Sequence, residues 1–184
     1  MKSVLISTRP QWCEKICHKI SKDENGKPIY EKRIDVRKSA PEEVPFKAYI
    51  YCTKDKPYLY GDMPIKEFYL DNGGYKGGEC NGIKLCNGKV IGEFICNEVE
   101  EFHEWELSPQ GKFADFERER LEKFLTDACL SEEEVVRYRE NLPYYKPLYG
   151  WHISDLKIYD KPLSLKELGV TRPPQSYMFV EELK

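Results

Sequence analysis

The stretch Glu31-Lys32-Arg33-Ile34-Asp35-Val36-Arg37-Lys38 decides both the fold and the candidate site. Its alternation of charged and β-branched residues predicts a strand over residues 30–38, because side chains two apart on a strand share a face. Arg33, Asp35 and Arg37 then lie on one face, and the two β-branched residues between them point to the core. Two guanidiniums that flank a carboxylate on one strand face predict a surface that binds anions.

The composition predicts one soluble domain that spans residues 1–184. The chain is 40% hydrophobic, enough to form a core, and 33% charged. No apolar run approaches the roughly 20 residues that cross a bilayer, and residues 1–9 lack the apolar stretch of a secretory signal. We therefore expect a cytoplasmic protein with no membrane partner.

The distribution of charge predicts a local anion site rather than a general affinity for nucleic acid. The net charge is -3, whereas nucleic-acid-binding proteins usually carry a basic excess. Residues 27–38 nevertheless hold five Lys and Arg against two acidic residues, and residues 93–106 hold six Glu with no Lys or Arg. One positive site on an acidic protein suits a small or specific anionic ligand.

The cysteines predict free thiols. Seven are present, and Cys13 and Cys17 are four residues apart, but no pair of CxxC motifs supplies four ligands for zinc. In a reducing compartment such thiols act as small hydrophobic residues. We expect neither a metal site nor a cofactor.

The N-terminal segments predict a strand, a helix and a turn. Residues 2–7 form a short buried strand, and Ser7 or Thr8 caps a helix that has Pro10 in its first turn. Residues 25–28 read as a turn. The helix is expected to pack inward on an apolar stripe that consists of Trp12, Cys13, Ile16, Cys17 and Ile20.

The rest of the chain predicts strands with few helices. The expected strands cover residues 46–53, half-buried with tyrosines on the second face, 89–99, 148–159 and 175–181. The expected helices cover residues 114–129 and a segment that Ser131 and Glu134 open as a capping box. Residues 54–87 read as a long loop or insertion. This pattern predicts an α+β fold around a small barrel.

The order of these motifs resembles the ASCH domain family of the PUA-like superfamily. The resemblance rests on Ser7-Thr8-Arg9-Pro10-Gln11-Trp12 opening a helix and on Lys32, Asp35 and Arg37, which fit the family's spacing of lysine, acid and arginine on the following strand. Asp35 stands where the family more often has glutamate. Segments 88–94, 149–156 and 172–176 resemble the longer, prophage-associated branch of the family.

The resemblance implies a PUA-like β pseudo-barrel with flanking helices and a cleft between them. It also implies that the partner is RNA or a nucleotide. The cleft is expected to be lined by residues that contact phosphate or base, namely Lys32, Arg33, Asp35, Arg37, Lys38 and Trp151.

Two alternatives remain open. Some small members of the superfamily imply a hydrolase, either an amidohydrolase on an acylated nucleoside or a ribonuclease, with Lys32 and Glu134 as the active pair; the family's threonine position holds Asp35. A lysine with a lowered pKa would serve as base or nucleophile. The other alternative is a phage-derived protein-interaction module whose acidic residues at 93–106 contact a basic partner.

Structural roles compete with ligand contact at two of these residues. Arg37 pairs with Asp35 or Asp155 in one interpretation and contacts a ligand in the other, since a guanidinium serves both purposes. Trp151 either belongs to the core or stacks on a base, and Gly150 leaves space beside it.

Overall fold

The computed structural model describes residues 1–54, 59–60, 63–64, 88–107 and 114–183. The elements in chain order are β1 (Lys2–Thr8), α1 (Pro10–Cys17), β2 (Lys19–Lys22), β3 (Pro28–Tyr30), β4 (Ile34–Arg37), β5 (Phe46–Cys52), β6 (Leu59–Tyr60), β7 (Met63–Pro64), β8 (Lys89–Cys96), β9 (Val99–Phe102), η1 (Glu104–Leu107), α2 (Ala114–Ala128), α3 (Glu132–Arg139), β10 (Leu148–His152), β11 (Ser154–Leu163), η2 (Leu165–Leu168) and β12 (Tyr177–Val180). Most of the insertion expected at 54–87 lies outside the described residues.

The larger sheet has five strands in the order β11-β8-β5-β1-β12. β1 pairs in parallel with β5 and antiparallel with β12. The apolar residues of β1 and β5 alternate between two core clusters, so both faces of the sheet are covered. This mixed arrangement of strands and helices confirms the expected α+β class.

The expectation of a half-buried β5 is wrong. Tyr49 and Tyr51 are 0% and 4% exposed, and they pack with Leu168 of η2 and with Val170. The Tyr49 hydroxyl also accepts a hydrogen bond from the Leu183 amide at 2.9 Å. The C-terminal segment therefore covers the face that local alternation assigns to solvent.

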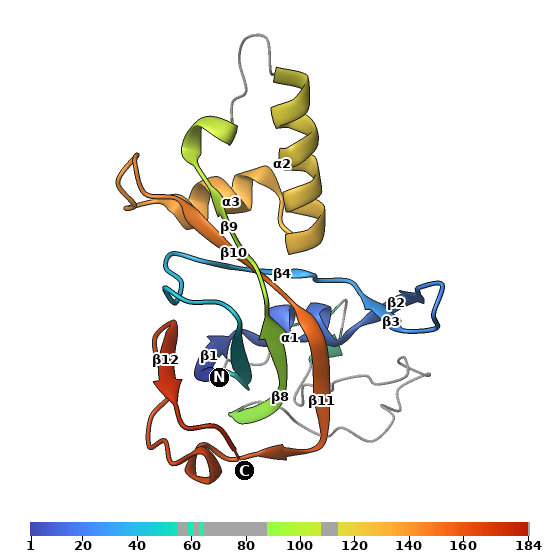
Figure 1. Ribbon diagram of the computed structural model, residues 1–184, viewed down its shortest axis with the longest axis vertical. Coiled ribbons are helices and arrows are strands. Elements are labelled where there is room, and N and C mark those ends of the chain that lie inside the picture. Colours follow the sequence, from blue (N-terminus) through green and yellow to red (C-terminus); the bar gives the residue numbers. More distant parts are fainter. Residues whose placement is uncertain (55–58, 61–62, 65–87, 108–113, 184) are drawn as a thin grey trace.

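The smaller sheet joins the strands to the helices. Its order is β4-β10-β9, and Figure 1 shows β9 and β10 extending from the larger sheet toward α2 and α3. Phe102 of β9 stacks on Phe124 of α2 with ring centroids 4.4 Å apart. A Cβ at Gly150 of β10 would lie 3.0 Å from the Phe124 ring, so glycine lets helix and sheet approach closely. The pairings give separate sheets among the described residues, and the pseudo-barrel stays a prediction.

The charged strand expected at 30–38 is divided. β3 pairs with β2 as a hairpin, closed where Asp23 Oδ1 accepts from the amides of Asn25 and Lys27. Ile20 therefore belongs to β2 and is 50% exposed, so its assignment to the helix stripe is wrong. α1 ends at Cys17, and β4 begins at Ile34. No helix in the described ranges is long and apolar enough to span a bilayer.

Candidate functional site

Lys32 enters the protein interior just before β4. The residue is 3% exposed, and its Nζ donates to the carbonyl of Ala128 at the end of α2. The ammonium also lies 5.1 Å from the centroid of the Trp12 ring. Burial lowers the pKa of Lys32 to about 8, an effect that the carboxylate of Asp35 opposes and the guanidinium of Arg37 reinforces.

Asp35 and Arg37 form a buried ion pair on β4. Arg37 Nε donates to Asp35 Oδ2 at 2.7 Å, and both side chains are 7% exposed. The remaining guanidinium nitrogens donate to the carbonyls of Ser7 and Ser176 and to the hydroxyl of Thr8. Arg37 thus ties β4 to the end of β1 and to the segment before β12. Of the two expected partners, Asp35 is confirmed, while Asp155 pairs with Lys27.

The other two cations of the stretch, Arg33 and Lys38, are exposed. The Arg33 side chain is 49% exposed, and its Nη1 lies 3.3 Å from Asp127 Oδ1. Lys38 donates to the carbonyl of Glu140 at 3.2 Å and lies 5.1 Å from the centroid of the Tyr138 ring. Arg33 therefore faces α2, whereas Lys38 faces the C-terminal end of α3.

Two further residues, Tyr138 and Arg9, lie close to the buried ion pair of Asp35 and Arg37. The sequence pattern assigned neither of them to the site. Tyr138 is 39% exposed. Burial raises the pKa of its hydroxyl, and the charges of Arg37, Asp35 and Arg9 act on it as well. Arg9 is exposed at the start of α1. We call this group the β4–α3 junction; its members are Arg9, Lys32, Asp35, Arg37, Lys38 and Tyr138.

Trp151 belongs to the core. It is 0% exposed and packs edge-on against Phe46 and Tyr177, with ring centroids 4.9 and 5.2 Å away. The Arg37 guanidinium lies 5.9 Å from its ring. The Trp151 ring therefore packs near the guanidinium of the buried ion pair, and it has no exposed face on which a base could stack.

Glu134 has a structural partner. Its carboxylate accepts from the Ser131 amide at 2.9 Å, and the Ser131 hydroxyl accepts from the Glu134 amide. This is the capping box expected from the sequence. Among the described residues, no hydrogen bond or ion pair joins Glu134 to Lys32, so their pairing as active residues stays a prediction.

The acidic residues at 93–106 are partly engaged within the protein. Glu93 accepts from the Tyr159 hydroxyl at 2.5 Å, and Glu100 lies 3.4 Å from His152 Nε2. Glu104 lies 3.3 Å from Arg139 Nη2. These carboxylates therefore do not form a uniform free surface.

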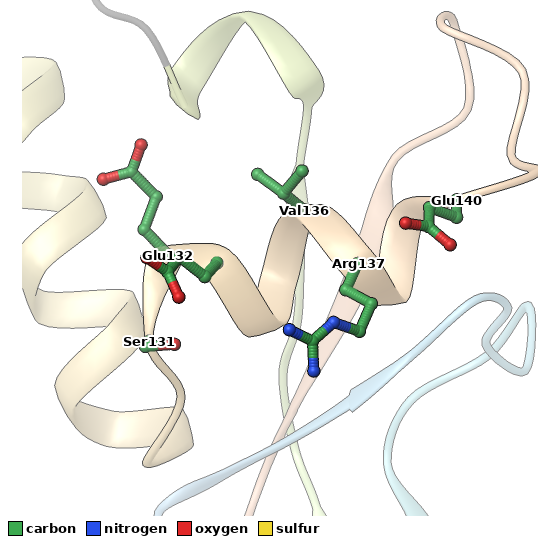
Figure 2. A pocket seen from close by; sticks show the side chains of 6 residues that line it. Ser131, Glu132, Val136, Arg137 and Glu140 are labelled. Carbon is green, nitrogen blue, oxygen red and sulfur yellow. The ribbon is translucent and has the colours of Figure 1, made fainter.

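Two surface hollows lie beside α3 and β12. One, of about 730 Å³, follows α3 and is acidic; Figure 2 shows Glu132, Val136, Arg137 and Glu140 along that helix. The other, of about 570 Å³, lies beside β12 and includes Met1 and Phe179. Neither hollow is lined by a residue that the sequence assigned to the site.

The described residues contain no group of three or more His, Cys, Asp or Glu side chains arranged to hold a metal ion. The five described cysteines are free thiols. Burial raises the pKa of Cys96 to about 12, so this thiol stays protonated at neutral pH.

Solved structures share this arrangement of strands and helices. ASCH from Zymomonas mobilis superposes with a TM-score of 0.57 at 16% identity, covering 98% of this chain and 89% of that one. The chain has the ASCH fold. A tyrosine-to-phenylalanine variant of the Zymomonas protein gives the same score at 15% identity over 99% of this chain and 92% of that one. No family model and no curated protein matches the sequence.

In this ASCH fold, the charged stretch lies where the helices meet the larger sheet. The structure brings together Lys32, Asp35, Arg37 and Lys38 of the expected site and adds Arg9 and Tyr138. It places Arg33 beside α2 and Trp151 in the core. Two features could have pointed to these added residues. Tyr138 follows Val135 by three positions on a short helix, and Arg9 belongs to the motif that opens α1.

Proposed function

We propose that the chain binds single-stranded RNA or a nucleotide at the β4–α3 junction. The observation that supports this most strongly is the imbalance of charge around Tyr138. The charges of Arg9 and Arg37 act on Tyr138, and the Lys38 ammonium lies 5.1 Å from the centroid of its ring; Asp35, which pairs with Arg37, is the carboxylate among the members of the junction. Lys32 adds a further positive charge beside Asp35 and Arg37. On a protein of net charge -3, such a local excess attracts an anion.

The members of the junction differ in what they can contribute to binding. Arg37 is held by Asp35 and by three further acceptors, so it supplies a fixed positive field rather than a mobile contact. Arg9 and Lys38 are exposed and can reach phosphate oxygens. The Tyr138 ring, 39% exposed between them, offers a face on which a base stacks.

Fluorescence anisotropy with a labelled single-stranded RNA tests this function. We expect the double variant Arg9→Ala/Lys38→Ala to weaken binding and to reduce the slope of log Kd against log salt concentration by about 0.7 for each lost phosphate contact. Lys22→Ala, an exposed lysine of β2, is the matched control. An unchanged slope in the double variant, with the control also unchanged, would contradict binding at the junction.

A hydrolase is the second candidate, and the lowered pKa of Lys32 favours it. With a pKa of about 8, roughly a tenth of the lysine is neutral at pH 7, ready to take a proton from water or a ribose hydroxyl. The substrate classes are an acylated cytidine and RNA. Turnover should rise with pH through about 8 and disappear in Lys32→Met. Binding without turnover of either substrate would leave only the first function.

A further inference from the structure

Two exposed aromatic rings lie close together near the C-terminal end of α3. Trp105 of η1 and Tyr144 after α3 are 47% and 62% exposed, with ring centroids 6.4 Å apart and planes inclined by 51°. His103 stacks behind Trp105 at 3.9 Å, with its plane inclined by only 14°. The two exposed rings form a wedge that is open to solvent and backed by a third ring. We call it the Trp105 wedge.

Arg139 lies between the two segments that carry these rings. The residue is 5% exposed, and its Nη2 donates to Glu104 Oε2 at 3.3 Å and to the Tyr144 carbonyl at 3.5 Å. Within the described part of the chain, Nε and Nη1 of Arg139 are buried and have no acceptor. Buried guanidinium donors without acceptors are costly, because each has given up its hydrogen bonds to water.

We propose that the Trp105 wedge binds a nucleobase that carries a carbonyl group, such as uracil, cytosine or guanine. The rings supply the stacking surface, and the carbonyl oxygen supplies an acceptor for the unpaired donors of Arg139 when the segment that carries Tyr144 shifts to admit it. The wedge contacts a base rather than a phosphate, because Glu104 at Arg139 and Glu101, 3.4 Å from His103 Nε2, repel anions.

The base site is separate from the junction in its chemistry. The junction collects cations for phosphate, whereas the wedge combines rings, unpaired donors and carboxylates. Tyr138 and Arg139 are neighbours on α3 and serve the junction and the wedge, respectively. A free nucleoside has no phosphate, so its binding reports the wedge without the junction.

Titration of the full chain with uridine and with adenosine, followed by tryptophan fluorescence, tests the wedge. Uridine should quench the exposed Trp105 and bind more tightly than adenosine, which has no carbonyl group. Trp105→Ala removes the reporting ring, so its binding is measured by calorimetry; we expect it to weaken uridine binding about tenfold or more. Phe116→Ala, which removes another exposed ring, on α2, is the control and should leave binding unchanged.

Arg139→Met separates hydrogen bonding from a structural effect. It keeps an apolar side chain of similar length, and we expect it to abolish the preference for uridine over adenosine while weak stacking persists. Equal quenching by the two nucleosides in the unaltered chain, or no quenching at all, overturns the proposal; the latter result would favour a peptide on the wedge. Arg9→Ala/Lys38→Ala should bind uridine normally, so failure at the junction and failure at the wedge are distinguishable.

Discussion

The ammonium of Lys32 lies 5.1 Å from the centroid of the Trp12 ring, and its hydrogen-bond acceptor in the described structure is the carbonyl of Ala128. An ammonium can donate three hydrogen bonds, and this one lies in a residue that is only 3% exposed to water. The cation–π contact offsets part of the desolvation. Because burial of a cation has a desolvation cost, replacing Lys32 tests whether its ammonium serves the fold or the proposed binding.

Replacing Lys32 with methionine should separate stability from function. The apolar side chain has a similar length and needs no hydrogen bonds, so we expect the free energy of unfolding to stay the same or rise by about 1–2 kcal/mol. Binding of single-stranded RNA should weaken. Urea denaturation and anisotropy measure the two effects. A large loss of stability would show that the Lys32 ammonium holds the fold together.

The free energy of unfolding of Lys32→Met should also depend on pH differently from that of the unaltered chain. Burial lowers the folded-state pKa of Lys32 to about 8 from 10.5, so between these values the unfolded chain binds more protons than the folded one. Stability from this group therefore rises with pH across that window. The difference in stability between Lys32→Met and the unaltered chain should shrink from pH 8 to pH 10.5, as measured by urea denaturation. A difference that is constant with pH would contradict the lowered pKa.

Removing Arg37 should unfold the junction rather than merely weaken binding. Arg37→Ala leaves the carboxylate of Asp35 buried and unpaired, at a cost of about 3–5 kcal/mol. The double variant Asp35→Asn/Arg37→Met removes both charges and should recover part of that loss. A double-mutant cycle of Asp35→Asn, Arg37→Met and the double variant, measured by chemical denaturation, gives the coupling. Purely additive losses would mean that the ion pair contributes nothing to the fold.

The contact between His152 and Glu100 should make stability depend on pH near neutrality. The nearby carboxylate of Glu100, with Oε1 3.4 Å from His152 Nε2, raises the pKa of His152 above 6.5. Its stabilisation is complete below the unfolded value of about 6.5 and is lost as pH rises through the raised folded value. Glu100→Gln should lower the His152 pKa in an NMR titration, whereas Glu119→Gln, exposed on α2, should not. No change in Glu100→Gln would exclude this contact.

A methyl group at Gly92 should disturb the pairing of β8 with β11. A Cβ there would meet the carbonyl oxygen of Lys157 and would lie 3.2 Å from the Cα of Ile158, both backbone atoms that cannot turn away. We expect Gly92→Ala to cost about 1–3 kcal/mol in urea denaturation. Gly26→Ala has open space but a φ of +78° and should cost about 1 kcal/mol. A smaller loss at Gly92 than at Gly26 would contradict the close approach.

Local signals predicted much of this fold correctly. The capping box of Ser131 and Glu134, the proline at the start of α1 and the part of the strand expected at 30–38 that forms β4 all depend on neighbours within a few positions. The ion pair of Asp35 and Arg37 was among the expected interpretations, since the two residues share a strand face.

Long-range packing explains what the sequence left undecided. Tyr49 and Tyr51 are covered by a segment more than a hundred residues away. Ile20 lies outside the helix because its segment pairs with β3 in a hairpin. Arg9 and Tyr138 come together through the placement of α3 against β4, which no local pattern encodes. The predicted residue Trp151 lies in the core because Phe46 and Tyr177 enclose it.

The position of β1 in the larger sheet has a consequence for synthesis of the chain. β1 is synthesised long before β12, the strand with which it pairs along one edge. Arg37 likewise needs the Ser176 carbonyl to complete its hydrogen bonds. The edge of β1 that pairs with β12 therefore stays open until residues 177–180 have been synthesised, and closure of the sheet is a late step in folding.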